Sequence, residues 1–284
     1  MLERLFLRPM YGGGGEAGGR VGGYNERYMT RLVRNYRSHP LLLQLPNALF
    51  YDGALQSHAD PMLSECRLQW EGLPRPGVPL FWDGVEGKED REANSPSWFN
   101  GDEAVRVLTH VRSLRRMRPD CRPEHIGIIT GYNKQVHKIK RLLTGDGLGD
   151  IKVGSTEMFQ GQERQIIIIS TVRSSLDMMG FDVKHSIGFL DNPKRFNVAV
   201  TRACCMLIIV GNPSVFINDP HWGRLLDLCQ EQGAYEGIPI RHRTDHDFAV
   251  AAQRIQDLLL DESPEDNHSS NDHAHEMPMP DFES

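Results

Sequence analysis

The chain lacks any apolar run of about 18 residues, the length that a membrane-spanning helix needs, anywhere in its 284 residues. Its start, Met1-Leu2-Glu3-Arg4, is not followed by an apolar stretch of the secretory-signal type. These two absences argue against a membrane span and a secreted product, and they predict an intracellular protein. The hydrophobic content of 39% is enough for a substantial core, so most of the chain is expected to be globular.

Cysteines are few and show none of the spacings that metal sites use. The five cysteines form no CxxC pair and no Cys/His pattern of the zinc-binding kind. Cys204 and Cys205 are adjacent in an apolar run, where successive side chains point to opposite faces of a sheet. We therefore expect reduced, mostly buried thiols and no metal site.

A Gly-rich phosphate loop is also missing. The pattern GxxxxGK[ST], whose backbone and lysine hold the β- and γ-phosphates of a nucleotide, does not occur. The glycine-rich stretch 12–23 is no substitute, because no apolar strand precedes it and no Gly-Lys-Ser/Thr follows it. Asp102-Glu103 mimics a magnesium-binding pair, but it follows Asn100-Gly101, which predicts a helix's first turn capped by Asn100. A complete site of the P-loop type is therefore not expected in this chain.

Positive charge is absent from the last part of the chain. Residues 261–284 hold eight carboxylates and no Lys or Arg, whereas the whole chain has 32 basic and 38 acidic residues and a net charge of -6. Without those eight carboxylates, residues 1–260 have 32 basic and 30 acidic residues, a balance of +2. This balance permits a nucleic-acid ligand without requiring one.

What the sequence does contain is an alternation of apolar runs and helical patterns. The runs are short and bounded by turn residues, which is typical of strands buried on both faces of a parallel sheet. The expected strands cover residues 79–82, 126–130, 151–155, 166–172 and 206–210. Leucine and valine at helical spacing fill gaps between them, as at Leu42, Leu45 and Leu49. The pattern predicts an α/β fold with a parallel sheet flanked by helices.

Composition divides the chain into four parts. Residues 1–30 contain a flexible Gly-rich loop, and residues 31–237 form the main domain. Residues 238–261 form a linker with an amphipathic helix that packs on the domain or on a partner, and residues 262–284 form a disordered acidic tail. The apolar face of that helix consists of Phe248, Ala251, Ile255 and Leu258.

Two arginines far apart in the sequence stand in short polar motifs. Tyr36 and Arg37 begin Tyr-Arg-Ser-His-Pro, where the ring can stack on a purine base and the guanidinium can reach a phosphate oxygen. Arg202 lies seven residues after Arg195, so both can face the same side of a helix. Such arginines can neutralise charge on a transferring phosphoryl group. Taken singly, each motif is also compatible with an ordinary surface.

A third motif, Val-Gly-Ser-Thr-Glu-Met-Phe-Gln-Gly-Gln-Glu, spans residues 153–163. Ligands of open α/β sheets lie outside the carboxyl ends of strands, so Ser155 and Thr156 are placed to hold a phosphate or a nucleic-acid backbone. Glu163 is placed to bond a ribose hydroxyl, and Gly161 lets the backbone approach a ligand closely. A hydroxyl-rich turn without a ligand is the alternative.

Together these motifs resemble the second RecA-like domain of a superfamily 1 helicase, in the branch of the nonsense-mediated-decay helicase. NYRSHP is similar to motif IV, VGSTEMFQGQE to motif V and RFNVAVTRA to motif VI. The segments that resemble the Armitage-type RNA-silencing helicases in particular are 87–92, 94–100, 187–190 and 192–195.

The resemblance implies a set of roles for named residues. Tyr36 stacks on adenine, Arg37 and Arg202 contact the γ-phosphate of ATP, and Glu163 bonds the ribose. Gln160 and Gly161 belong to the same nucleotide-binding motif. The residues that the resemblance places near the RNA track are Thr130, Tyr132, Ser155, Thr156 and Arg173.

The resemblance also implies what must come from elsewhere. The lysine loop and the Mg²⁺ ligands belong to a first RecA-like domain, so the chain is expected to be truncated at its N-terminus and inactive toward ATP alone. Single-stranded or duplex RNA, that first domain and RNA-silencing proteins are the expected partners, in the cytoplasm and in RNA granules. Two alternatives remain: an inert half-helicase that binds RNA or protein through its arginine-rich helix or its tail, and a fragment of a DNA helicase.

Overall fold

The computed structural model describes residues 27–28, 30–92, 97–117, 120–175, 189, 192–217 and 219–240. Its centre is a six-stranded sheet in the order β10-β3-β9-β8-β6-β7, and every pairing within it is parallel. The strands are β3 (Leu80–Gly84), β6 (Ile126–Thr130), β7 (Lys152–Gly154), β8 (Arg164–Ser170), β9 (Ala203–Gly211) and β10 (Tyr235–Gly237). The predicted parallel α/β sheet is confirmed.

The central strands are buried on both faces, as their continuous apolar runs predict. In β8, Ile167 and Ile169 belong to one hydrophobic cluster, whereas Ile166 and Ile168 belong to a second cluster on the opposite face. This division follows from the period of two residues in a strand. Cys205 is likewise buried and Cys204 half-buried, consistent with side chains that alternate between faces.

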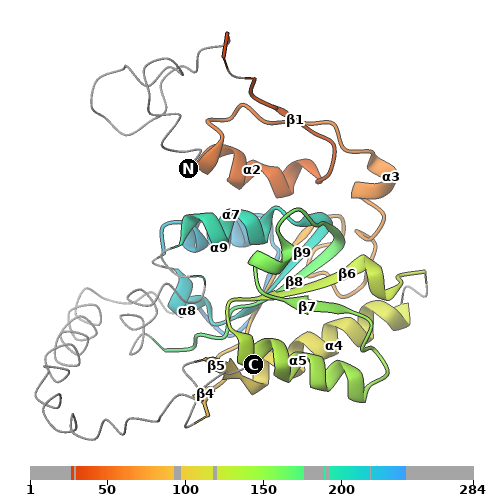
Figure 1. The fold of residues 1–284 in the computed structure, drawn as a ribbon, viewed down its shortest axis with the longest axis vertical. Coiled ribbons are helices and arrows are strands. Elements are labelled where there is room, and N and C mark those ends of the chain that lie inside the picture. Colours follow the sequence, from red (N-terminus) through yellow and green to blue (C-terminus); the bar gives the residue numbers. More distant parts are fainter. Residues whose placement is uncertain are drawn as a thin grey trace, which may run out of the picture.

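Helices cover both faces of this sheet, as Figure 1 shows. One face packs against α7 (Pro193–Val200), α8 (Pro213–Phe216), α9 (Trp222–Glu231) and α2 (Pro40–Phe50). The other face packs against α4 (Gly101–Met117) and α5 (Asn133–Gly145). Trp222 is fully buried in the first layer, and its ring contacts those of Phe189, Phe196 and Phe216. The result is a three-layer α/β domain.

Short elements complete the described chain. The pair β1 (Arg34–Asn35) and β2 (Gln56–Ser57) is parallel, and β4 (Glu89–Arg91) and β5 (Trp98–Asn100) are antiparallel. The remaining pieces are α3 (Pro61–Ser64) and the 3₁₀ turns η2 (Pro123–His125) and η3 (Glu157–Phe159). Among the described residues, no helix has the length and apolar character needed to cross a membrane.

The helix α4 begins where the sequence predicts a helix start. The Oδ1 atom of Asn100 accepts a hydrogen bond of 3.1 Å from the backbone N–H of Glu103, so Asn100 caps the helix as predicted. Asp102 and Glu103 therefore lie in the first turn of α4 and not at the end of a strand. The predicted Gly-rich loop, amphipathic helix and acidic tail, at 12–23, 248–258 and 262–284, lie outside the described residues.

Candidate functional site

The motif that contains Arg37 is anchored to the start of β9. The Oδ1 atom of Asn35 accepts hydrogen bonds from the backbone N–H groups of Arg37 and Ser38, each at 2.9 Å. This is the local turn that asparagine side chains favour. The hydroxyl of buried Ser38 then donates to the carbonyl of Ala203 at 2.8 Å, and the N–H of His39 donates to the carbonyl of Cys204 at 2.8 Å. These contacts hold Arg37 beside the beginning of a central strand.

Arg202 reaches the same place from the end of α7. That helix ends at Val200, and the guanidinium of Arg202 turns back so that its Nε donates to the carbonyl of Val198 at 3.0 Å. Cations favour this position because the last carbonyls of a helix are unpaired and partly negative. Its Nη1 donates to the carbonyl of Gln162 at 3.2 Å and its Nη2 to the hydroxyl of Thr201 at 2.9 Å.

The two arginines meet around Glu163 and Thr201. The Nε of Arg37 is ion-paired with the carboxylate of Glu163, and its Nη1 lies 3.4 Å from the carbonyl of Thr201. The pKa of Arg202 lies below its ordinary value because the group is largely buried and because the charge of Arg37 is close. We call Arg37, Glu163, Thr201 and Arg202 the arginine cluster. The predicted convergence of Arg37 and Arg202 is therefore seen in the structure.

The arginine cluster does not lie at the carboxyl edge of the sheet, where we expected Glu163. Glu163 directly precedes β8 and Arg202 directly precedes β9, and the N–H of Arg164 donates to the carbonyl of Arg202 at 3.0 Å. The cluster therefore occupies the amino edge. The rule about carboxyl ends concerns residues that follow a strand, whereas Glu163 and Arg202 each precede one.

An aromatic pair stands next to Arg37. The side chain of Tyr36 is exposed, with 66% of the residue accessible, and its ring lies 5.5 Å from that of His58 at an angle of 36°. Parallel pairing of β1 with β2 creates this neighbourhood, and the N–H of His58 donates to the carbonyl of Asn35 at 2.7 Å. His58 was not predicted from the sequence, because nothing local indicates that β2 pairs with β1.

The residues Gln160 and Gly161 form an exposed turn between η3 and β8. Gly161 has a φ of +73°, and no atom lies within 4 Å of the place that a Cβ would take. The left-handed backbone alone accounts for a glycine here. The open space beside it is also compatible with the predicted close approach of a ligand to the backbone.

The residues predicted to lie near the RNA track occupy the other edge of the sheet. Thr130 ends β6, and Tyr132 follows it before α5. Arg173 follows β8, and its guanidinium stacks over the rings of Trp98 at 4.5 Å and Tyr132 at 5.5 Å. Its Nη1 pairs with Glu89 at 3.4 Å, and its Nε donates to the hydroxyl of Tyr132 at 3.0 Å. Tyr132 and Arg173 are thus in contact, and Thr130 ends the strand that precedes Tyr132.

Most of these side chains are buried and are not exposed to a ligand at the surface. Thr130, Tyr132 and Arg173 are at most 1% exposed and Thr156 is 2% exposed, while Ser155, which follows β7, is half-buried. Stacking of a buried guanidinium between two aromatic rings fixes the shape of this edge. A contact between these residues and RNA stays a prediction, and a buried position suits a supporting role better than direct contact.

Glu103 is the second residue that sequence analysis missed. Its carboxyl is fully buried at the carboxyl edge, where Oε2 accepts from the hydroxyl of Ser170 at 2.6 Å and from the N–H of Val172 at 2.8 Å. Its Oε1 lies 3.3 Å from the hydroxyl of Thr171. Burial raises the pKa of Glu103 to about 8, against the opposing effect of these hydrogen bonds. Glu103 therefore ties α4 to the segment that carries Arg173.

A three-layer α/β domain built on a six-stranded parallel sheet is consistent with a RecA-like fold. An AAA domain family matches residues 20–214. The chain belongs to that family and, as its motifs predicted, to the Armitage-like RNA helicases within it.

Three named relatives show how similar the chain is to known proteins. The chain is 50% identical over 241 residues to the mouse protein RNA helicase Mov10l1, with 84% of this chain and 20% of that protein covered. It is 46% identical over 256 residues to the zebrafish Putative helicase mov-10-B.2, covering 85% and 25%. The fruit-fly Probable RNA helicase armi is 37% identical over 249 residues, covering 84% and 21%. The chain thus spans a quarter or less of these relatives' length.

Proposed function

We propose that residues 31–237 form the second RecA-like domain of an ATP-dependent RNA helicase. The observation that carries the proposal is the convergence of Arg37 and Arg202, which come from motifs 165 positions apart in the sequence, at one edge of the sheet. Two guanidinium groups beside an exposed aromatic ring match the chemistry of a nucleoside triphosphate. The relatives named as RNA helicases support RNA as the track.

In this proposal a first RecA-like domain holds the nucleotide, and the domain described here closes over it. Tyr36 and His58 face the base, and Arg37 and Arg202 reach the γ-phosphate across the cleft. Glu163 exchanges its ion pair with Arg37 for a hydrogen bond to the ribose, which frees Arg37 to turn to the phosphate. Arginines that reach the phosphate in this way stabilise the charge of the transition state and increase the rate of hydrolysis by a factor of roughly 10³ to 10⁵.

Magnesium chemistry is assigned to the companion domain. Among the described residues, no group of three His, Cys, Asp or Glu side chains is placed to hold a metal ion. Glu103, which mimics a magnesium ligand in sequence, is buried and bonded to Ser170 and Val172. Mg²⁺, when bound, neutralises charge on the phosphates, and this chain's part is to add its arginines to the same phosphate.

Closure and opening of the cleft couple hydrolysis to movement along the strand. We assign the carboxyl edge, with Ser155 and the layer built on Thr130, Tyr132, Thr156 and Arg173, to the support of the RNA track. A role in RNA-mediated silencing, in cytoplasmic RNA granules, follows the family resemblance.

The alternative is an inert module that binds through the basic helix α4 or through the tail. The tail lies outside the described residues, and most arginines of α4 are already ion-paired or hydrogen-bonded. Arg106 pairs with Asp83 at 3.2 Å, Arg112 pairs with Asp146, and Arg115 donates to the carbonyl of Cys121. Three of the four arginines of α4 therefore make contacts within the domain. This observation favours the motor over a module that binds RNA through this helix.

A hybrid helicase tests the proposal. In it, this chain replaces the matching segment of mouse RNA helicase Mov10l1, so that the first RecA-like domain is present. We expect ATP hydrolysis that RNA stimulates, and unwinding of RNA duplexes faster than of DNA duplexes. A folded hybrid that binds RNA but does not turn over ATP would support the inert alternative, and preferential unwinding of DNA would support the DNA helicase.

Replacement of His58 by alanine in the hybrid helicase is expected to weaken ATP binding by about 2-fold to 10-fold. An aromatic pair contributes about 0.5 to 1.5 kcal/mol beyond its buried area, and the loss of His58 leaves Tyr36 without its ring contact. Equilibrium titration with ATP measures the effect. The matched control is His137→Ala, an exposed histidine on α5. If Tyr36→Ala weakens binding and His58→Ala does not, His58 has no part in the base contact.

A further inference from the structure

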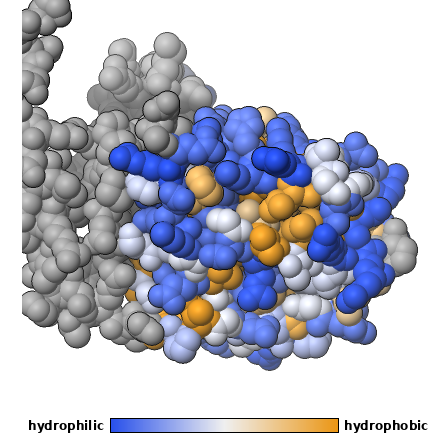
Figure 2. Space-filling model, turned by 90° about the horizontal axis from the view of Figure 1, so that it is seen from below, coloured by the Kyte–Doolittle hydropathy of each residue, from blue (hydrophilic) through white to orange (hydrophobic). Residues whose placement is uncertain are grey.

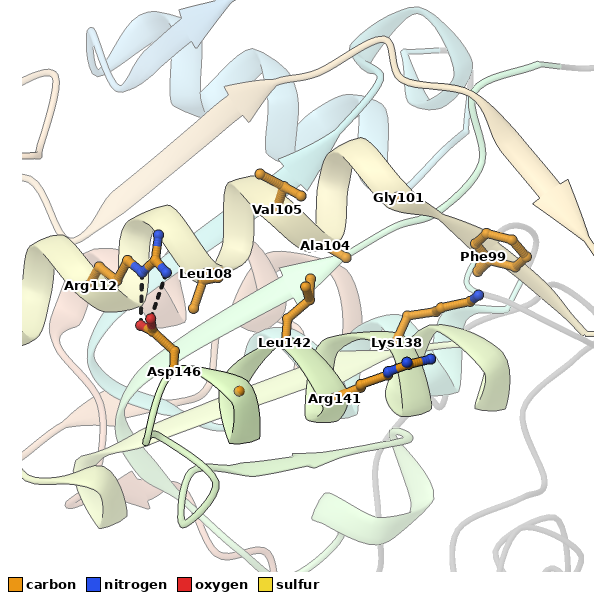
Figure 3. Close-up of a pocket in the computed structure, with 11 residues that line it drawn as sticks. Phe99, Gly101, Ala104, Val105, Leu108, Arg112, Lys138, Arg141, Leu142 and Asp146 are labelled. Carbon is orange, nitrogen blue, oxygen red and sulfur yellow. Dashed lines mark hydrogen bonds and ion pairs between the residues drawn. The ribbon is translucent and has the colours of Figure 1, made fainter.

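The face of the domain over α4 and α5 has hydrophobic residues surrounded by hydrophilic ones (Figure 2), and a groove of about 560 Å³ lies between these helices (Figure 3). Two cations on its rim already have partners within the domain. Arg112 donates to Asp146 at 2.8 Å, and the ammonium of Lys138 lies 3.6 Å from the carboxylate of Glu92. These two charges are therefore not available to select a ligand. A pair of thiols near the start of β9, by contrast, makes a contact that defines a chemistry.

Cys66 and Cys205 lie 139 positions apart in the sequence, and the fold brings their thiols together. Cys66 is in the turn after α3, and Cys205 is in β9. The backbone N–H of Arg67 donates to the Sγ of Cys205 at 3.2 Å. Because about 2.4 Å separate that nitrogen from the Cα of Cys66, this Cα lies within about 6 Å of the Cys205 sulfur. The two thiols are hydrogen-bonded to each other, so a bond between them needs a shift of side chains and not of a whole element.

The two thiols differ in access and in protonation. Cys205 is fully buried, whereas Cys66 is half-buried. The thiol of Cys66 donates to the carbonyl of Leu63 at 3.2 Å, which leaves its sulfur to accept from the thiol of Cys205. The hydrogen bond with Cys66 and burial both raise the pKa of the Cys205 thiol. Cys205 therefore keeps its proton, and Cys66 is the sulfur of the pair that a small solute reaches first.

We propose that Cys66 and Cys205 form an oxidation site, which a peroxide converts into a disulfide. The sulfur of Cys66 attacks one peroxide oxygen, so that an S–O bond forms and the O–O bond breaks. The released hydroxide takes the Cys66 proton and leaves as water. The sulfur of Cys205 then attacks the sulfenic acid of Cys66, the S–S bond forms, and the hydroxyl leaves with the Cys205 proton as a second water. Two thiols are oxidised, and one peroxide molecule is reduced.

The other three cysteines fit this site less well. Cys121 and Cys229 are fully buried, so a solute does not reach their sulfurs. Cys204 is half-buried and within electrostatic reach of Cys66, which makes it the competing partner. The hydrogen bond of Cys66 identifies Cys205 as the partner. The site does not depend on nucleotide binding.

The disulfide ties the turn after α3 to the central sheet and closes a loop of about 140 residues. Such a crosslink restricts the unfolded chain, so the oxidised chain is expected to unfold at a temperature about 5 to 15 °C above that of the reduced chain. Thermal unfolding of both forms measures the shift. An oxidised chain that unfolds at the same or a lower temperature would contradict a bond formed from the contact described here.

Peroxide oxidation of the full chain, followed by thiol counting, tests the site directly. Five thiols react in denaturant before oxidation, and three are expected after a small excess of hydrogen peroxide has acted on the folded chain. Tryptic digestion should then release the peptides of Cys66 and Cys205 as one linked species, two hydrogens lighter than their sum. Cys66→Ser, which keeps a donor for the carbonyl of Leu63, should abolish this species. Cys204→Ala, the matched control at the neighbouring position, should retain it.

Three results would overturn the proposal. One is a folded chain that keeps five thiols under conditions that oxidise the unfolded chain. Another is a linked species whose fragmentation assigns the bond to Cys204, or which Cys204→Ala abolishes and Cys205→Ala retains. The third is linkage found only in a species of twice the mass, which places the bond between two copies of the chain. Fragmentation of the linked species from the unsubstituted chain identifies the partner even if a variant does not fold.

Discussion

Replacement of Arg202 by alanine is expected to slow ATP turnover of the hybrid helicase by a factor of roughly 10³ to 10⁵. In the structure this guanidinium lies within the electrostatic reach of Arg37 and borders Glu163, at the edge that we assign to the γ-phosphate. Binding of ATP should change much less, because the first domain holds most of the nucleotide. Steady-state turnover and equilibrium ATP binding, measured on the same preparations, separate the two effects.

Two further variants make this prediction specific. Arg202→Lys keeps the charge but loses the planar fork, so most of the rate should still be lost. Arg195→Ala removes an arginine from α7, the helix that precedes Arg202. The Nε of Arg195 donates to Glu157 at 2.8 Å, so turnover of this variant should stay within a few fold of the unsubstituted hybrid. Unchanged turnover in Arg202→Ala would remove this residue from the reaction. Thermal unfolding checks that the lost contacts to Val198 and Gln162 have not unfolded the domain.

Replacement of Glu103 by glutamine is expected to remove a pH dependence of stability. The folded protein holds the proton of this buried carboxyl up to a pKa of about 8, whereas the unfolded chain releases it near the ordinary value of 4.5. The contribution to stability is therefore fully present below pH 4.5 and is lost progressively as the pH rises to about 8. The slope in this window is about 1.4 kcal/mol per pH unit, so the total is roughly 4 to 5 kcal/mol.

Glutamine suits this position because it copies the protonated carboxyl. Its oxygen can accept from Ser170 and Val172 as Oε2 does, and its amide can donate to the hydroxyl of Thr171. Denaturant unfolding of both proteins between pH 5 and 8.5 should show the difference between them growing with pH. The control Asp102→Asn changes an exposed neighbour in the same turn and should leave the slope unaltered. Parallel pH profiles for Glu103→Gln and the unsubstituted chain would mean that Glu103 is ionised when folded.

Much of the fold was predictable from the sequence because its cause is local. The isoleucine run of β8 and the apolar run of β9 are long enough and continuous enough to indicate buried parallel strands. The cap at Asn100 and the spacing of apolar residues likewise fixed the start and the inner face of α4. Each of these features depends on residues that are neighbours in the chain.

The unpredicted parts of the site depend on contacts between distant segments. His58 lies beside Tyr36 only because β2 pairs with β1, and Glu103 reaches Ser170 only because the first turn of α4 lies beside the end of β8. The amino-edge position of Glu163 was missed for a related reason. The motif 153–163 was placed by the strand 151–155 that it follows, whereas Glu163 at its end directly precedes the strand predicted at 166–172 and so lies at the amino end of that strand. Arg37 and Arg202 could be predicted to converge because the motifs indicated a shared ligand.

The most direct test of the account is the affinity of the hybrid helicase for ADP with aluminium fluoride, which mimics the transferring phosphoryl group. If Arg37 and Arg202 contact that group, each alanine variant should bind ADP as the unsubstituted hybrid does but bind the ADP–fluoride complex at least about 100-fold more weakly. If both variants bind the ADP–fluoride complex as tightly as the unsubstituted hybrid, the two arginines do not contact the transferring phosphoryl group, and the account is contradicted.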